Sequence, residues 1–423
     1  MKKFRTDWLA SRPVFYNEKT LKISHNVNDV IDFEDIEIHS EGFNNYLNFG
    51  YSVFGQTPVK NVKFLRHSSE IFVENNKIKI IEHPDPVEKW FSEKTEYSDE
   101  NEVMELIKQK IQNYEKETKG LIIIPTSGGF DSRLLNYFIK DKSRIRAFTY
   151  GISKKQGDSF EAVYAKKLCE ILDINWKRIE LGNFHKYFDE WDELFGISTH
   201  AHGMYHIEFY KQILQDKNLE GANFISGIFG DAWAGSIKFK KIYSLLELNF
   251  LGYTHGLNAD VNKSKLDCDY RYRKEFYEKE KINDYRYQII NIIRLKILLI
   301  SYLLSVPEHY GFKVWSPYLD MDVALGMINL PPERRRNRQW QIDFFRKNGI
   351  YIEDLGLRMT KKNSLNYEAM KTIPLESLDK NLLSMIVDEK YVDWINNNVQ
   401  NTNLMILKEF LFSQDTQDSF FLN

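Results

Sequence analysis

LIIIPTSGGFDS, residues 121–132, is the stretch that decides the fold of this chain. Its first five residues form a short apolar run, which is typical of a buried parallel strand. A helical pattern follows and runs to about Ile139. Between them, Gly128 and Gly129 allow the backbone to approach a ligand closely. Because consecutive N–H groups at the start of a helix bind anions, this strand, loop and helix predict a phosphate-binding loop.

The side chains of the loop agree with that prediction. Ser127 and Ser132 can donate hydroxyl hydrogen bonds to phosphate oxygens, with Phe130 and Asp131 between them. Phosphates would repel the Asp131 carboxylate unless it held a cation, and Mg²⁺ is the cation that commonly bridges phosphate oxygens. A Gly-Gly turn with a capping serine and a solvated aspartate is the alternative. A Walker A loop does not fit, because no GK[ST] closes the loop.

Apolar runs and helical patterns continue to alternate outward from this loop. Strand patterns occupy residues 144–150, 175–181 and 222–226, and helical patterns occupy residues 160–172 and about 204–214. This alternation predicts an α/β fold with a doubly wound parallel sheet. After about residue 240 the patterns are mostly helical.

The chain before the loop has a different character. Short strand patterns predict a small β-rich domain over residues 1–95, with a hairpin turn at Asn75-Asn76 and a boundary near residues 83–86. Residues 96–118 are expected to form a linking helix capped by Ser98. The remaining residues, 119–423, are predicted to form the domain that carries the loop.

Bulk composition narrows the class of protein. The 423 residues carry 58 Lys and Arg against 60 Asp and Glu, which argues against a large nucleic-acid surface. Two cysteines without metal-ligand spacing suggest a reducing, cytoplasmic compartment. We expect no signal peptide and no membrane span, since the apolar stretch from Ile289 is short and includes Arg294 and Lys296.

SGGFDS at residues 127–132 resembles the SGGxDS pyrophosphate loop of the N-type ATP pyrophosphatases, which cleave ATP between the α and β phosphates. A second segment, ISGIFGDA at residues 225–232, is similar to the LSGEGADE segment of the asparagine synthetase family. This resemblance implies an adenine nucleotide alpha hydrolase-like fold. It also implies nucleotide contacts at Ser226 and Gly227, with Mg²⁺ on Asp131 and Asp231. Ordinary turn dipeptides are the alternative for the second segment.

Two further segments match the same branch. VWSPYLD at residues 314–320 resembles the family's VRxPFLD, and RMTKK at residues 358–362 lies where the family keeps a lysine against the phosphates. The resemblance therefore implies a catalytic role for Lys361 or Lys362 together with Asp131. A solvated lysine pair is the alternative. The backbone from Phe148 to Tyr150 is expected to face the adenine.

The chain also departs from the family. Lys2 stands where the family's glutaminase has its nucleophilic cysteine, and residues 1–95 are about half the usual length. We therefore expect a shortened, inactive glutaminase-like domain, with nitrogen supplied as free ammonia, by a partner glutaminase or by an amine on another molecule. Ile228 and Ala232 replace the two glutamates of GEGADE, and Trp315 replaces an arginine, which argues against aspartate as the substrate.

The resemblance implies an ATP-dependent carbon–nitrogen ligase with ATP and Mg²⁺ at its site. Such an enzyme would adenylate a small-molecule or peptide carboxylate, release pyrophosphate, and form an amide with ammonia or an amine from a separate supplier. Surface-polysaccharide and natural-product pathways are the expected settings. A tRNA-modifying enzyme of the same class, or a nucleotide-binding pseudoenzyme or partner subunit, is the alternative.

Two polar clusters stay open to more than one interpretation. His200, His202 and His206 allow a zinc site, but no fourth ligand is evident nearby. The lining of a pocket or the start of a surface helix is favoured instead, and a contact to the acceptor substrate is the functional alternative. The basic run over residues 334–338 allows a solvated helix start or a site for an anionic acceptor.

Overall fold

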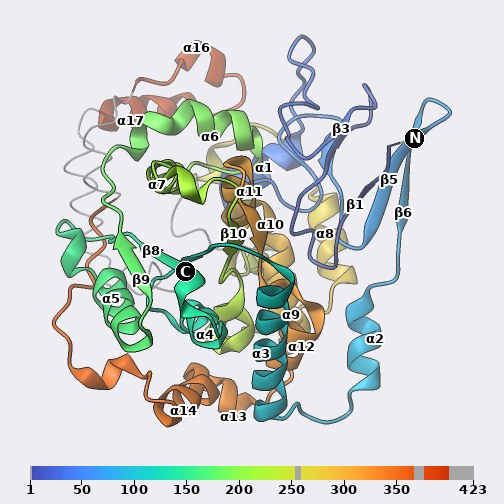
Figure 1. The fold of residues 1–423 in the computed structure, drawn as a ribbon. Helices are drawn as coiled ribbons and strands as arrows, with labels where there is room; N and C mark the ends of the chain where they lie inside the picture. Colours follow the sequence, from blue (N-terminus) through green and yellow to red (C-terminus); the bar gives the residue numbers. More distant parts are fainter. Residues whose placement is uncertain (1, 253–258, 366–375, 400–423) are drawn as a thin grey trace.

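A five-stranded parallel sheet carries the predicted loop in this computed structural model, which describes residues 2–252, 259–365 and 376–399 (Figure 1). All neighbouring strands of the sheet are parallel. The predicted α/β parallel fold is therefore confirmed, with one further strand, β11, that the sequence patterns did not indicate. In spatial order the strands are β11 (Lys313–Trp315), β10 (Asn223–Ile225), β7 (Ile122–Pro125), β8 (Ile145–Thr149) and β9 (Asn175–Arg178).

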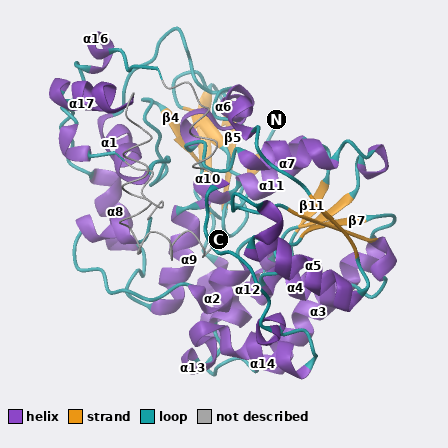
Figure 2. Cartoon of the chain, turned by 90° about the vertical axis from the view of Figure 1, so that its left-hand side faces the viewer, coloured by secondary structure: helices purple, strands orange, loops and turns teal. Residues whose placement is uncertain are grey.

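Helices cover both faces of the sheet because successive side chains of a strand point to opposite sides. Ile122 and Ile124 of β7 pack into one apolar core, whereas Ile123 packs into another. Figure 2 shows the strands between these two groups of helices. The first core includes α3 (Glu100–Glu117), α4 (Phe130–Phe138), α5 (Phe160–Leu172) and α12 (Met321–Ile328), and the second includes α6 (Phe188–Phe195), α7 (Tyr205–Ile213) and α11 (Tyr302–His309).

The N-terminal residues form two small antiparallel sheets of three strands each. The predicted hairpin turn is confirmed, because Asn75 and Asn76 join the fifth and sixth strands with φ angles of 50° and 55°. The strand predicted from Tyr51 onward does not form, because Tyr51 makes only an isolated bridge to Thr199, so that prediction is wrong. The elements are β1 (Phe4–Arg5), β2 (Phe15–Asn17), β3 (Ile23–Ser24), α1 (Ser40–Phe49), β4 (Val62–Phe64), β5 (Ser69–Glu74), β6 (Lys77–Glu82) and α2 (Pro86–Glu93).

The cap of α3 differs from the expectation. Asp99, not Ser98, is the N-cap residue, and its carboxylate accepts hydrogen bonds from the N–H groups of Asn101 and Glu102. A carboxylate gains from the helix dipole as well as from these hydrogen bonds, which favours it over a hydroxyl. Ser98 instead donates its backbone N–H to the carbonyl of Asn329.

The C-terminal part is mainly helical, as expected. Within the described residues no single helix is long and apolar enough to cross a membrane; only the bent pair Tyr285–Leu295 and Ile297–His309, which meet at 59°, has sufficient apolar length when taken together. The last part of the third predicted domain, residues 400–423, lies outside the described residues. The helices are α8 (Arg271–Lys279), α9 (Tyr285–Leu295), α10 (Ile297–Ile300), α13 (Pro332–Arg335), α14 (Gln339–Lys347), α16 (Lys380–Leu383) and α17 (Glu389–Val399).

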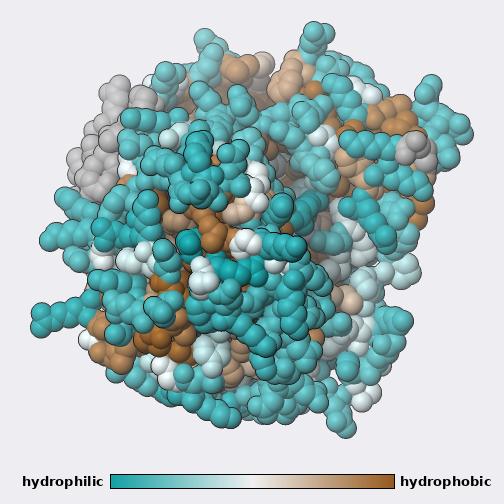
Figure 3. Space-filling view, viewed as in Figure 1, coloured by the Kyte–Doolittle hydropathy of each residue, from teal (hydrophilic) through white to brown (hydrophobic). Residues whose placement is uncertain are grey.

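The molecular face seen in Figure 3 is mostly hydrophilic, with apolar side chains in separate patches. Exposed large apolar residues occur in several places, including Tyr243 and Leu246 in the chain after β10 and Trp394 in α17. Scattered exposure of this kind is normal for a globular protein and indicates no function by itself.

The central position of β7 predicts a large cost for truncating its core side chain. Ile124 is fully buried, so Ile124→Ala is expected to lower the free energy of unfolding by about 2–5 kcal/mol through lost burial and an internal cavity. Ile80 in β6 is 40% exposed, so Ile80→Ala should cost less than about 1 kcal/mol. Urea unfolding followed by fluorescence measures both, and equal losses would contradict the central place of β7.

Candidate functional site

The predicted loop lies at the carboxyl end of β7, where α/β sheets bind their ligands. Thr126 anchors its first residue by donating its N–H to the carbonyl of Phe148, over 2.8 Å. Gly128 then adopts a left-handed φ of 71°, and Gly129 serves as the N-cap of α4 without any side-chain cap. Ser127 is exposed at the tip of the loop, and its hydroxyl accepts the Gly129 N–H. The loop therefore presents backbone N–H groups and the Ser127 hydroxyl at the start of a helix. The predicted donor Ser132 is buried, and its hydroxyl donates to the Gly129 carbonyl at 3.2 Å.

Packing beneath the loop gives it one shape. A Cβ atom on Gly128 would lie 2.4 Å from the Cβ of Tyr164, so only glycine fits against α5. Arg133, fully buried, donates a 2.7 Å hydrogen bond to the Gly128 carbonyl. The same guanidinium holds both carboxylate oxygens of Glu353, at 2.8 and 2.9 Å. This bidentate pair has the geometry that gives arginine its positional specificity.

Asp131 and Asp231, the two predicted metal ligands, lie side by side at the ends of β7 and β10. A Cβ atom on Gly230 would be 2.6 Å from the Asp131 carboxyl carbon, and the Asp231 backbone N–H favours the ionised form of Asp131. Oδ1 of Asp131 has no hydrogen-bond partner. Two adjacent carboxylates, one with an uncommitted oxygen, form a donor set suited to a hard divalent cation.

Burial raises the pKa of Asp131 to about 7, and the nearby negative charge of Asp231 contributes to the rise, while Arg338 opposes it. The Asp131 side chain is only 16% exposed, so water does little to stabilise its charge. A cation beside the carboxyl would favour its ionised form.

Two cations that the sequence did not assign face these aspartates. Nη1 of Arg338 lies 3.6 Å from Oδ1 of Asp131, and the guanidinium stands 4.7 Å from the centre of the Phe130 ring. Lys296, in the break between α9 and α10, lies within the electrostatic influence of Asp231. Burial lowers the Lys296 pKa to about 8.

The basic run that ends at Arg338 is not simply a solvated helix start. Arg335 is buried and donates to the Trp233 carbonyl, whereas Arg334 pairs with Glu100 and Asp343. Only Arg336 fits the description of an exposed arginine. The sequence does not tell which of these arginines face inward, so only the tertiary structure shows that the run belongs to the site.

The segment after β10 uses its polar groups partly for its own structure. Ser226 donates its N–H to the Trp315 carbonyl at 2.8 Å, and its hydroxyl accepts the Ile228 N–H at 3.2 Å. Gly227 packs against the Cβ of Asp131. Ile228 and Ala232, where the glutamates of the resembling family would stand, are buried in the apolar core. The carboxylates are thus replaced by core side chains.

The predicted adenine-facing residues follow β8. The Phe148 side chain lies in the core, so only its backbone could face a ligand there. Tyr150 is half-buried, and its hydroxyl lies 3.4 Å from Nε2 of His206. Glu161, for which the sequence predicted no role, lies close enough to Tyr150 to influence it electrostatically. Burial raises the pKa of Glu161 to about 7, and Oε2 of Glu161 has no hydrogen-bond partner.

The segment of Lys361 and Lys362 lies beside α5, the helix that carries Tyr164. The backbone of Thr360 bonds to both Asp158 and Phe160. Nζ of Lys361 is 5.9 Å from the Phe160 ring, which packs on Tyr164 with 4.5 Å between ring centres. Both lysines are exposed, next to the start of α5.

The histidines form an aromatic cluster. Within the described part of the chain, no group of three His, Cys, Asp or Glu side chains is arranged to hold a metal ion. The His206 ring is buried near Tyr205, Tyr210 and Tyr302. Burial lowers its pKa to about 3, so the imidazole is neutral at physiological pH. A structural lining fits this environment better than a zinc site.

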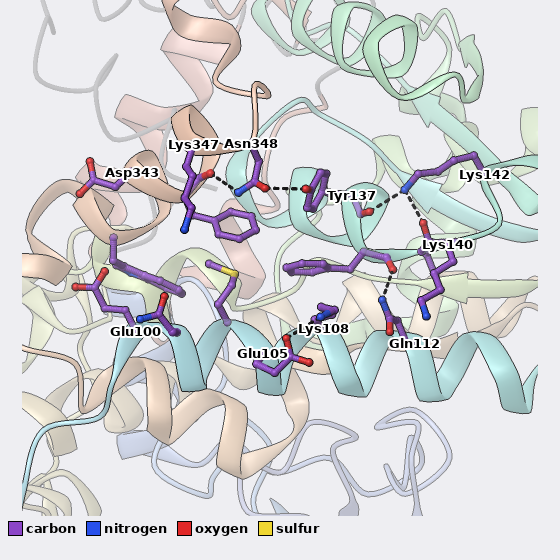
Figure 4. A pocket seen from close by; sticks show the side chains of 16 residues that line it. Glu100, Glu105, Lys108, Gln112, Tyr137, Lys140, Lys142, Asp343, Lys347 and Asn348 are labelled. Atoms are coloured by element: carbon purple, nitrogen blue, oxygen red, sulfur yellow. Dashed lines mark hydrogen bonds and ion pairs between the residues drawn. The ribbon is translucent and has the colours of Figure 1, made fainter.

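A surface groove of about 760 Å³ lies elsewhere, between α3, the end of α4 and α14. Figure 4 shows charged side chains along its sides, with Glu100 and Lys108 on the side of α3 and Lys347 and Tyr137 on the opposite side. None of the predicted site residues lines it. The groove meets the carboxyl end of α4, whereas the loop precedes the amino end of that helix.

Fold and site together define an α/β protein with a glycine-containing loop and an aspartate pair at the carboxyl edge of its parallel sheet. No protein-family model matches the chain, and no curated protein matches it. Among the solved structures that match is an NH3-dependent NAD synthetase from Campylobacter jejuni, with 16% sequence identity and a TM-score of 0.28. That match covers 48% of this chain and 96% of the synthetase. The class rests on the strand pairing and the site geometry, not on this distant likeness.

The loop geometry predicts that Gly128→Ala is more harmful than a glycine substitution without close neighbours. Gly120 has a similar φ of 80° but no atom within 4 Å of an added Cβ, so Gly120→Ala should cost about 1 kcal/mol from the left-handed backbone alone. Gly128→Ala adds the overlap with Tyr164 and should lower stability further. Thermal unfolding of both variants tests this difference, and equal losses would show that the loop is not held against α5.

The low pKa of His206 predicts an acid-sensitive fold. Between about pH 6.5 and 3 the unfolded chain binds a proton at this imidazole that the folded protein does not, so stability falls as pH falls, by up to about 1.4 kcal/mol per unit. His206→Phe should flatten the dependence of unfolding free energy on pH in this window. The exposed His25→Phe is the control, and an unchanged slope in His206→Phe would contradict the burial argument.

Proposed function

We propose that this chain is an ATP-dependent carbon–nitrogen ligase of the asparagine synthetase-like ATP pyrophosphatases. It adenylates a substrate carboxylate, releases pyrophosphate, and passes the acyl group to ammonia or an amine. The observation that carries the proposal is the contact between the segment of Asp231 and the Asp131 side chain, directly beside the uncapped start of α4. A nucleotide's phosphates and their cation need these two features next to each other.

The aspartate pair fits a magnesium ion that arrives with the nucleotide. Asp131 and Asp231 supply anionic oxygens, and Oδ1 of Asp131 accepts no hydrogen bond, although Nη1 of Arg338 lies 3.6 Å away. The two carboxylates would hold the ion together with phosphate oxygens of the nucleotide, as is usual for Mg²⁺. Such an ion would neutralise charge on the phosphates.

Each predicted residue then has a role in the reaction. Backbone N–H groups from Gly128 to the start of α4, with the hydroxyls of Ser127 and Ser132, would cradle the pyrophosphate. The substrate carboxylate attacks the α-phosphorus, which breaks the bond to the pyrophosphate. Lys361 or Lys362 would stabilise the negative charge on that leaving group. Positioning and charge stabilisation supply most of the acceleration in phosphoryl-type transfers.

The acceptor is a small-molecule or peptide carboxylate other than aspartate, within a cytoplasmic surface-polysaccharide or natural-product pathway. Ile228 and Ala232 support this choice, since both are packed in the apolar core and cannot act on an acceptor as glutamates would. Lys2 in place of a nucleophilic cysteine supports nitrogen from free ammonia, a separate supplier or an amine substrate.

A nucleotide-binding subunit without turnover is the second candidate. Arg338 favours it, because the guanidinium lies beside Asp131 where a cation would be needed. The two candidates differ in whether the chain makes and breaks the bond between the α and β phosphates.

Exchange of labelled pyrophosphate into ATP tests the proposal. With the correct carboxylate, found by screening for AMP release, the protein should catalyse exchange, and Asp131→Asn or Asp231→Asn should each reduce its rate by at least about 100-fold through loss of cation-mediated charge stabilisation. Asp35→Asn, at an exposed ion pair with Lys19, is the control and should retain the rate. Nucleotide binding without exchange or AMP release across the screen would favour the second candidate.

A further inference from the structure

Arg338 forms an ion pair with Asp131 that differs from the structural ion pair nearby. The Asp131 pair spans 3.6 Å, and neither Oδ1 of Asp131 nor Nη1 of Arg338 has a hydrogen-bond partner. Arg133, two residues along the same helix, instead grips Glu353 through two hydrogen bonds of 2.8 and 2.9 Å. The contrast separates a closed pair, which fixes structure, from an open pair that a competing ion can enter.

The backbone aims Arg338 at this position. Asn337 and Arg338 have φ angles of 53° and 58°, an arrangement that L residues rarely adopt in succession. The turn of Asn337 and Arg338 packs against the segment after Asp231. A Cβ atom on Gly235 would overlap the Arg335 carbonyl, and the Arg335 guanidinium donates to the Trp233 carbonyl. Strained backbone that packing maintains is characteristic of functional sites.

The surroundings keep the guanidinium at the site once it leaves the carboxylate. It lies over the face of Phe130, at 4.7 Å, and Tyr318, whose hydroxyl donates to the Asp131 carbonyl, lies within its electrostatic influence. The Arg338 side chain is 23% exposed, so solvent compensates its charge only in part. If a cation takes Asp131, the guanidinium needs another anion, and planar guanidinium forks suit phosphate oxygens.

We propose that Arg338 is an exchangeable countercharge for Asp131. In the nucleotide-free protein its guanidinium neutralises the carboxylate; a divalent cation displaces it, and it then pairs with a phosphate of the bound nucleotide. The arginine thus couples cation entry to nucleotide binding at one carboxylate. This inference deepens the proposed function, since the phosphate belongs to the proposed substrate.

The exchange predicts opposite effects on two affinities. With Mn²⁺ as the probe and no nucleotide, Arg338→Met should bind the ion about 5-fold more tightly than the unaltered protein, because the competing charge is gone. With Mg²⁺ present, the same variant should bind ATP about 10-fold more weakly, because one phosphate contact is lost. Electron paramagnetic resonance of free Mn²⁺ and calorimetric titration of ATP measure these affinities.

Matched variants separate this role from a structural one. Arg336→Met removes an exposed arginine from the same turn and should change neither affinity. Arg338→Lys keeps the charge and should leave Mn²⁺ affinity near that of the unaltered protein. Arg338→Gln removes the charge and takes the place of Arg338→Met if the latter does not fold. Melting temperatures report whether each variant folds.

Each outcome decides the matter. Tighter Mn²⁺ binding with weaker ATP binding supports the exchange, whereas Mn²⁺ binding that is unchanged or weaker in the charge-removing variants overturns it. Absence of Mn²⁺ binding in every folded variant also overturns it. Failure of pyrophosphate exchange with the two opposite shifts intact would reject the ligase and keep the countercharge, so the two proposals fail separately.

Discussion

Two like-charged side chains held next to each other are the constraint on which the rest of the site depends. Asp131 lies in the first turn of α4 and Asp231 follows β10, and a Cβ atom on Gly230 would lie 2.6 Å from the Asp131 carboxyl carbon. Such an arrangement is costly unless a cation offsets it, and Arg338 and Lys296 supply positive charge in the nucleotide-free protein. The ion pair at Asp131 therefore suits the proposed exchange of cations better than a permanent salt bridge would.

The scaffold around the aspartates is rigid where the site requires it. The buried Arg133 joins the Gly128 carbonyl, the Glu353 carboxylate and the Ile350 carbonyl, so the loop, α4 and the segment after α14 are tied together by one side chain. Tyr164 of α5 closes the other side of Gly128. Preorganised backbone N–H groups bind an anion with little loss of entropy, which is the benefit of a loop that cannot relax.

Part of the contact between the N-terminal residues and the parallel-sheet part of the chain lies just after α1. Ser52 bonds to the backbone of Ile197 and Ser198, and the carbonyl of Gly50 accepts from His200. The histidine motif therefore belongs to the junction between the N-terminal residues and α7. The buried His206 and the half-buried His200 and His202 fit an interface that stabilises the two parts against each other. The glutaminase-like character of residues 1–95 and the domain limits stay predictions.

The local pattern of the sequence was sufficient for the parallel strands β7, β8, β9 and β10, the Asn75-Asn76 turn and the glycine loop, because each of these depends on neighbours in the chain: apolar periodicity, turn chemistry and the freedom of glycine. β11 was missed because Lys313–Trp315 begins with a charged residue and has no continuous apolar run on either side, and it is a strand through its pairing with β10. The adjacency of Asp131 and Asp231 followed from sequence only through the resemblance to a known family. The inward position of Arg338, Lys296 and Glu161 depends on the tertiary structure alone. These residues lie outside the loop motif, and their properties follow from burial and from the charges that folding brings beside them.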